Sequence, residues 1–180
     1  VALLREHGVR STHVVGAGLG GMVALALARD TGRVRSLVLV GTALSGDGYD
    51  PEPMFANPTD EEGLRSSMET AFSREFVDAQ PGAVADIAAW RAAEDATPDS
   101  WEKQAAALES FAIEAPYEIT EPALVIHGSD DRLCPIARGE ELAQDLPKGE
   151  LYEVEGAGHL AHIEASREVN DRLRGFFDEQ

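Results

Sequence analysis

The chain has few cysteines and lacks any long hydrophobic run. Its 180 residues contain a single cysteine, Cys134, which excludes an intrachain disulfide and is typical of a protein in a reducing compartment such as the cytoplasm. No stretch of about 18 apolar residues occurs. No charged-then-apolar leader is present either, so the sequence signals neither membrane insertion nor secretion.

Basic residues are scarce. The chain carries 33 Asp and Glu against 15 Lys and Arg, a formal net charge of −18, and its only lysines are Lys103 and Lys148. A surface this acidic repels nucleic acid and anionic membranes, so we expect neither as a partner. The excess resembles the lysine-poor surfaces of halophilic proteins, whose self-repulsion is screened by high ionic strength. The length is sufficient for one domain with a sizeable core.

A glycine-rich segment follows the first apolar run and precedes a helical run. Residues 16–21 read G-A-G-L-G-G. Gly16, Gly18 and Gly21 fit the dinucleotide fingerprint G-x-G-x-x-G, in which backbone N–H groups bind a pyrophosphate at a helix N-terminus. The same residues fit the nucleophile elbow G-x-S-x-G, with Gly18 in the place of the serine. These six residues leave both interpretations open.

The next strand favours the second interpretation. Residues 34–40 read V-R-S-L-V-L-V, which is typical of a buried parallel strand. A dinucleotide site needs a carboxylate near the end of that strand, about 20 residues past the glycines, to hold the ribose. The chain has Gly41, Thr42 and Ala43 there. The cofactor interpretation therefore lacks its second requirement, and we expect no cofactor.

Two later loops carry an acid and a histidine. The apolar strand at 123–126 is followed by H-G-S-D-D, which ends at Asp131, and the strand at 151–154 is followed by E-G-A-G-H, which ends at His159. Nucleophile position, acid and histidine in that chain order are typical of the α/β-hydrolases. In such sites the carboxylate fixes the imidazole tautomer and stabilises the imidazolium formed during proton transfer.

Together these segments resemble the α/β-hydrolases of the esterase, lactonase and non-haem haloperoxidase-like group. The matching blocks, in chain order, are 16–28, 34–42, 124–135 and 154–159. The resemblance implies an α/β fold that is the C-terminal part of the family's parallel sheet, with about four strands flanked by helices and a helical cap insertion. The family's earlier strands have no counterpart before Val1, so we interpret the chain as truncated at its N-terminus.

The resemblance also implies the site residues. Asp131 and His159 are the expected catalytic acid and histidine, and the backbone N–H of Leu19 is the expected oxyanion-hole donor. The nucleophile position is Gly18, which has no side chain. We expect the imidazole of His159 to face an empty space above Gly18, and we expect no metal.

The resemblance divides the chain into core, cap and core. The expected ranges are 1–42, 43–118 and 119–180. Within the cap the sequence predicts a loop over 46–58 and helices over 60–76, 83–93 and 100–112. Trp90 and Trp101 belong to the cap, where they either roof the pocket or pack cap against core.

Other polar residues have simpler interpretations as solvent-facing, packed or turn residues. Asp131 itself has an alternative role as a turn residue capping the helix that begins near residue 136. His162 and Glu164 lack the spacing of a helical zinc site. No strained strand-to-helix turn holds Ser11, Ser45 or Ser129, so none is an obvious substitute nucleophile. The remaining candidates are His127, Asp130, Glu140 and Glu141.

Three functions remain open. The first is a hydrolase-fold protein that binds or acts on a small ester, lactone or similar carbonyl compound. Ordinary serine-ester hydrolysis is then weak or absent, because loss of the nucleophile costs on the order of a million-fold in turnover. The second is an enzyme that uses the Asp131–His159 dyad alone, as a lyase or by activating water. The third, ranked last, is a dinucleotide-binding module. In each case, an unpaired edge on the first strand favours self-association.

Overall fold

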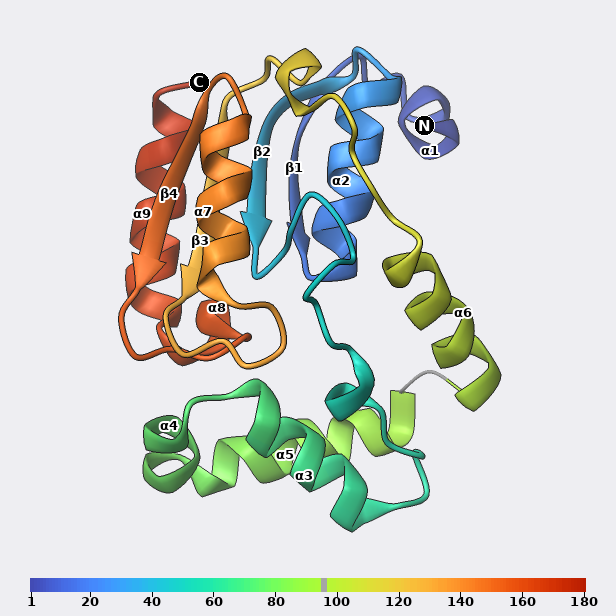
Figure 1. Cartoon of the computed structure of the whole chain (residues 1–180), viewed down its shortest axis with the longest axis vertical. Helices are drawn as coiled ribbons and strands as arrows, with labels where there is room; N and C mark the ends of the chain where they lie inside the picture. The colour runs from blue at the N-terminus through green and yellow to red at the C-terminus, as the bar shows by residue number, and fades with distance from the viewer. Residues whose placement is uncertain (95–96) are drawn as a thin grey trace.

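The architecture is an alternation of strands and helices interrupted by a run of helices. The structure is a computed structural model that describes residues 1–94 and 97–180. Its strands are β1 (Thr12–Ala17), β2 (Val34–Val40), β3 (Ala123–Gly128) and β4 (Gly149–Val154). Its helices, labelled in Figure 1, are α1 (Ala2–Glu6), α2 (Leu19–Asp30), α3 (Glu61–Ala71), α4 (Arg74–Ala79), α5 (Pro81–Glu94), α6 (Pro98–Glu109), α7 (Ile136–Asp145), α8 (Ala161–Glu164) and α9 (Ser166–Asp178).

The strands form one parallel sheet in the order β1-β2-β3-β4. β2 and β3 lie in the centre and are buried almost throughout, as the apolar run at 34–40 predicts for a strand covered on both faces. The fold class predicted from the sequence, a parallel sheet of four strands flanked by helices, is confirmed. Because the strands are parallel, their carboxyl ends lie along one edge, where the loops carrying the candidate site residues emerge.

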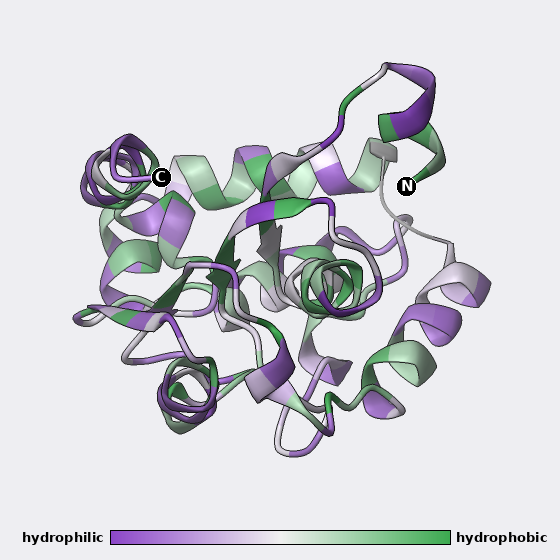
Figure 2. Cartoon of the chain, turned by 90° about the horizontal axis from the view of Figure 1, so that it is seen from above, coloured by the Kyte–Doolittle hydropathy of each residue, from purple (hydrophilic) through white to green (hydrophobic). Residues whose placement is uncertain are grey.

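Helices cover both faces of the sheet. α2 and α7 cover one face, where Leu25 and Leu142 pack with Leu39 and Val125 of the strands. α9 covers the other face through Val169 and Phe176, which belong to a cluster with Val38, Leu124 and Ile126. Figure 2 shows that the helices around the rim alternate hydrophobic and hydrophilic residues along their length. Such alternation is typical of helices with one face on a core and one in solvent.

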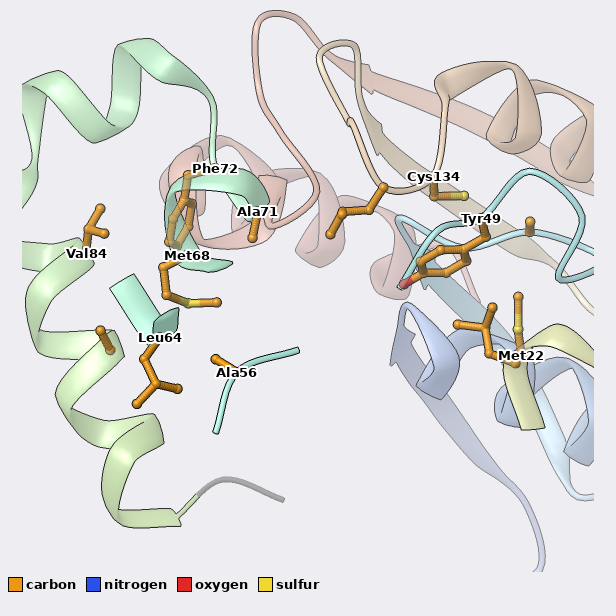
Figure 3. Packing of buried hydrophobic residues seen from close by; sticks show 13 residues of the cluster. Met22, Tyr49, Ala56, Leu64, Met68, Ala71, Phe72, Val84 and Cys134 are labelled. Atoms are coloured by element: carbon orange, nitrogen blue, oxygen red, sulfur yellow. The ribbon is translucent and has the colours of Figure 1, made fainter. Parts of the chain in front are cut away.

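Three of the helices between β2 and β3 form a layer beyond the carboxyl ends of the strands. α3, α4 and α5 lie there as a separate layer in Figure 1. Leu64, Met68 and Phe72 pack with Val84 of α5 in one buried cluster (Figure 3). The division into core and cap at 1–42, 43–118 and 119–180 stays a prediction. Among the residues described, no helix is both long and apolar enough to cross a bilayer.

The single helix predicted over 60–76 is wrong, because the chain forms two helices there. α3 ends at Ala71 and α4 begins at Arg74. Phe72 has an extended backbone, and the Ser73 side chain caps α4 by accepting a hydrogen bond from the Phe76 N–H. The apolar residues at intervals of four span both helices, so periodicity alone does not locate the break.

The exposed edge of β1 leads to a prediction about association. In the described chain β1 pairs with β2 alone, and Val15 on β1 is 57% exposed. We expect this 180-residue chain to self-associate through β1, more strongly at high salt, where the net charge of −18 is screened. Sedimentation equilibrium across concentration and salt measures this, with Val15→Lys expected to reduce association. A monodisperse monomer with cooperative melting under all these conditions would contradict the prediction.

Candidate active site

The turn between β1 and α2 has the geometry of a sharp strand-to-helix elbow. Its central residue, Gly18, has φ +51° and ψ −124°, a conformation that favours glycine. The Gly18 N–H donates to the Val40 carbonyl at 2.9 Å, and the Thr42 hydroxyl donates to the Gly18 carbonyl at 2.8 Å. The elbow is therefore held against the end of β2 through both the N–H and the carbonyl of Gly18.

Of the other three glycines in this turn, two permit close packing. A Cβ atom on Gly16 would strike the Gly20 carbonyl, and a Cβ atom on Gly21 would lie 2.5 Å from Cγ2 of Thr42. A Cβ atom on Gly20 would meet nothing within 4 Å, so close packing does not explain this third glycine.

Gly41 explains why no carboxylate follows β2. It has φ +51°, and a Cβ atom there would lie 3.1 Å from both Cε1 and Nδ1 of His159. The position at which a dinucleotide site needs an acidic side chain is thus the position that must stay clear for the His159 ring. The local geometry fits the hydrolase elbow and not a ribose-binding strand end.

The structure brings Asp131 and His159 together. His159 Nδ1 lies 2.8 Å from Asp131 Oδ2, and both side chains are buried. The other oxygen, Asp131 Oδ1, accepts the backbone N–H groups of Leu133 and Cys134 at 2.9 Å each. Asp131 therefore caps its own turn and binds the histidine at once. It does not cap α7, whose N-cap residue is Pro135 and has no side-chain cap.

The surroundings keep Asp131 ionised. Burial opposes ionisation, but the imidazoles of His127 and His159 and the backbone N–H of Cys134 outweigh it and lower the pKa of Asp131 below its ordinary value. His127 Nε2 lies 2.7 Å from the Cys134 carbonyl and 3.3 Å from Asp131 Oδ2. Because a carbonyl only accepts, the proton of neutral His127 is on Nε2.

Tyr49 is a site residue that sequence reasoning missed. Its hydroxyl lies 3.0 Å from His159 Nε2, and a Cβ atom on Gly18 would lie 2.7 Å from that oxygen. The expectation of an empty space above Gly18 is therefore wrong. Figure 3 shows the Tyr49 ring among the other buried side chains of the cluster. No motif marks Tyr49, and its only sequence signal is its place in the loop after β2.

A small cavity opens over the elbow. It has a volume of about 200 Å³, below the roughly 300–1,000 Å³ usual for drug-sized ligands. Gly18, Leu19, Tyr49 and His159 are among its lining residues, and the others are Ala17, Pro51, Met54, Trp101, Gln104, Ala105, Leu108 and Leu160. Of the two tryptophans, Trp101 thus contacts the cavity.

The role of the Leu19 N–H as an oxyanion donor stays a prediction. α2 begins at this residue, and the first N–H groups of a helix have no acceptor within it. Two other residues are unsuited to a role in this site. Trp90 is 66% exposed and does not line the cavity. Burial raises the pKa of the Cys134 thiol to about 12, which disfavours a thiolate nucleophile. In the described part of the chain, none of Ser11, Ser45 and Ser129 lines the cavity.

Glu164 links the histidine loop to the helical layer. Its carboxylate accepts from the Gly158 N–H at 2.7 Å, and from the N–H and hydroxyl of Ser73 at 3.1 and 2.6 Å. Gly158 directly precedes His159 in the chain. Glu164 therefore positions the histidine loop against the start of α4. Across residues 1–94 and 97–180, no group of three or more His, Cys, Asp or Glu side chains is arranged to hold a metal ion.

Comparisons with known proteins agree with this geometry. The model of the alpha/beta hydrolase family matches residues 1–172. The chain is 26% identical over 175 residues to a putative carbamate hydrolase, RutD, of Pseudomonas savastanoi pv. phaseolicola, covering 91% of this chain and 66% of that protein. It is 31% identical over 176 residues to the pyrrolizixenacetamide deacetylase of Xenorhabdus hominickii, covering 91% and 64% respectively.

A solved structure shows the same fold. The structure described as Est816, an N-acyl homoserine lactone degrading enzyme, has a TM-score of 0.80 and 27% identity, covering 97% of this chain and 71% of that chain. The fold, the elbow and the acid and histidine loops define an α/β-hydrolase. The chain belongs to the alpha/beta hydrolase family. It spans about two thirds of the length of the two curated relatives described above.

Removal of the Asp131 carboxylate tests its structural role. Asp131→Ala leaves three buried donors without their acceptor, and we expect it to lower the free energy of unfolding by about 3 kcal/mol at pH 7. The milder Asp131→Asn gives the pH dependence. A carboxyl whose pKa is lowered by folding contributes stability that is fully present above its unfolded pKa of about 4 and is lost as pH falls toward the folded value.

Urea denaturation between pH 7 and pH 3 measures this dependence. The stability difference between the parent and Asp131→Asn should be constant above about pH 5 and shrink below pH 4. Asp130→Asn, an exposed neighbour, is the matched control and should change stability by less than about 0.5 kcal/mol. A difference that grows as the pH falls would contradict the assignment.

The Glu164 contacts lead to a separate prediction. Glu164→Ala removes the acceptor of two backbone N–H groups and one hydroxyl, so we expect a loss of about 2 kcal/mol in the free energy of unfolding. The amide of residue 158 should also exchange with solvent faster, which hydrogen exchange measures by mass spectrometry or NMR. The control is Glu155→Ala, which changes an exposed carboxylate in the same loop. Unchanged exchange at residue 158 would show that Glu164 does not hold the loop.

Proposed function

We propose that this protein acts on a small ester, lactone or similar carbonyl compound, which it binds in the cavity over Gly18. Asp131 and His159 are the proton-transfer pair, and serine-ester chemistry is absent because residue 18 has no side chain. The observation that carries the proposal is the 2.8 Å contact between Asp131 Oδ2 and Nδ1 of His159, a residue that also lines the cavity.

The placement of protons on Asp131 and His159 supports this role. Asp131 is held ionised and only accepts, so His159 donates from Nδ1 and keeps a lone pair on Nε2. An imidazole in this tautomer takes a proton at Nε2, and the buried carboxylate stabilises the imidazolium that results. The Leu19 N–H at the start of α2 is the candidate donor to a developing oxyanion.

The size and lining of the cavity support a small, mainly apolar substrate. Leu19, Met54, Leu108 and Leu160 supply apolar surface, whereas Tyr49 and His159 supply polar atoms beside the elbow. The relatives named above are described as a putative carbamate hydrolase, a deacetylase and an N-acyl homoserine lactone degrading enzyme, which supports a carbonyl substrate. A dyad-only mechanism, as a lyase or by water activation, uses the same proton acceptor.

Substitution of the histidine tests the proposal. We expect His159→Gln to lower kcat/KM for short aryl esters and lactones by about 10²- to 10⁴-fold, since the general base is lost. Hydrolysis followed by pH-stat or by release of 4-nitrophenol measures it. His7→Gln, in the exposed turn after α1, is the control and should retain parental activity. The proposal fails if the parent neither hydrolyses nor binds any such compound, or if His159→Gln retains full activity.

A further inference from the structure

Acyl transfer requires a nucleophile, and Gly18 at the elbow has no side chain to supply one. The Tyr49 hydroxyl lies in the space where such a side chain would be. The Tyr49 oxygen lies 2.7 Å from where a Cβ atom of residue 18 would be and 3.0 Å from His159 Nε2. A serine hydroxyl at residue 18 would need this same space beside the imidazole. We propose that the Tyr49 hydroxyl is the nucleophile of this site, an inference that rests on the carbonyl-hydrolase function proposed above.

The hydrogen bonds run in the direction that a nucleophile requires. Asp131 Oδ2 accepts the proton of His159 Nδ1, which leaves the lone pair of Nε2 facing Tyr49. The Tyr49 O–H therefore donates to Nε2. A hydroxyl within about 2.6–3.2 Å of a base that is oriented by a third group is the arrangement by which hydrolytic nucleophiles are activated.

The surrounding structure holds Tyr49 in this position. Its N–H donates to the Gly46 carbonyl, and the N–H of Asp50 donates to the Leu133 carbonyl at 2.8 Å, which ties the loop to the turn after Asp131. The ring packs edge-on against the His159 ring, with centroids 5.5 Å apart and an interplanar angle of 62°. The loop and the ring packing thus fix the oxygen next to the base.

Burial governs how this hydroxyl would react. It raises the pKa of Tyr49 above its ordinary value, so the phenol is neutral at rest. The proton leaves only as His159 accepts it during attack, which is how an uncharged serine hydroxyl is activated. The raised pKa therefore does not exclude the role.

The reaction balances in two steps. His159 Nε2 takes the Tyr49 proton as the phenol oxygen attacks the carbonyl carbon, and the bond to the leaving oxygen breaks as that oxygen takes the proton from Nε2. The product is an acyl ester on Tyr49. Water then gives a proton to Nε2 and attacks the acyl carbon, the bond to Tyr49 breaks, and the phenol oxygen recovers the proton. The sum is ester plus water giving acid plus alcohol.

A phenol nucleophile restricts the class of substrate. Free phenols ionise near pH 10 in water, and the buried Tyr49, although its pKa is raised, still leaves a tetrahedral intermediate more readily than an aliphatic alcohol does. An alkyl ester would therefore expel Tyr49 again and regenerate the substrate. An enol or phenol leaving group departs at least as readily as the buried Tyr49, and the acyl part must fit a cavity of about 200 Å³. The substrate class is short-chain esters and lactones of enols or phenols.

The same geometry prevents a side chain on residue 18 and the Tyr49 hydroxyl from occupying this space together. A Cβ atom on residue 18 would lie 2.7 Å from the Tyr49 oxygen but 3.8 Å from Cζ, which is ordinary van der Waals contact. A serine at residue 18 is therefore obstructed by the Tyr49 oxygen, and Tyr49→Phe removes that obstruction. The double variant Gly18→Ser/Tyr49→Phe therefore moves the nucleophilic hydroxyl from residue 49 to residue 18.

The first experiment measures turnover of phenyl acetate. We expect Tyr49→Phe to lower kcat/KM by at least about 100-fold while circular dichroism shows a folded protein. The matched control is Tyr117→Phe, which removes an oxygen from a side chain that is 67% exposed and should retain parental turnover. Retention of parental turnover by Tyr49→Phe overturns the proposal.

The second experiment locates the covalent bond. After incubation with diethyl 4-nitrophenyl phosphate, peptide mass spectrometry should find the diethylphosphoryl group on Tyr49 and not on Tyr117 or Tyr152. The adduct should be absent in His159→Gln. In Gly18→Ser/Tyr49→Phe it should appear on residue 18. Equal labelling of the three tyrosines, or labelling that persists in His159→Gln, overturns the proposal.

The two proposals fail in distinguishable ways. If phenyl acetate is hydrolysed and His159→Gln abolishes this while Tyr49→Phe does not, the carbonyl hydrolase stands and the Tyr49 nucleophile falls. If the parent neither hydrolyses the ester nor binds short esters, both fall together.

Discussion

The buried hydrogen bond between Asp131 and His159 is the interaction on which the geometry of the candidate site depends. It joins the loops after β3 and β4 at the carboxyl edge of the sheet. The histidine ring reaches this position because Gly41, at the end of β2, has no side chain to block it. The bond also orients the ring, so that its second nitrogen is directed at the elbow. Three adjacent strand ends thus meet at one imidazole.

The elbow and the loop after β2 share the space beside that imidazole. Gly18 leaves room that the Tyr49 oxygen occupies, and the polarity of the hydrogen bonds from Asp131 through His159 is retained. A change at either position alters what the other can accommodate. Gly18 and Tyr49 therefore form a structural pair, because the absence of a side chain at residue 18 leaves room for the Tyr49 hydroxyl.

The helical layer is attached to the same loops. Arg132, next to Asp131, donates to the carbonyl groups of Glu69 and Phe72 near the end of α3, at 2.6 and 2.8 Å. Arginine at a helix C-terminus satisfies carbonyl groups that lack partners within the helix. Glu164 makes the second attachment, to Ser73. Both anchors therefore join this layer to the loops that carry Asp131 and His159.

Local sequence determined the parts of this protein that depend on short-range pattern. The apolar run at 34–40 became β2 with the same bounds, and the order of elbow, acid loop and histidine loop identified the family, because each signal lies within a few neighbouring residues. The break between α3 and α4 was missed because apolar residues at intervals of four span both helices, although the Ser73 cap at the start of α4 is itself a local signal. Tyr49 was missed because no local signal marks it. Its significance comes from a 3.0 Å approach to His159, 110 residues along the chain, and only the folded sheet brings those two side chains together.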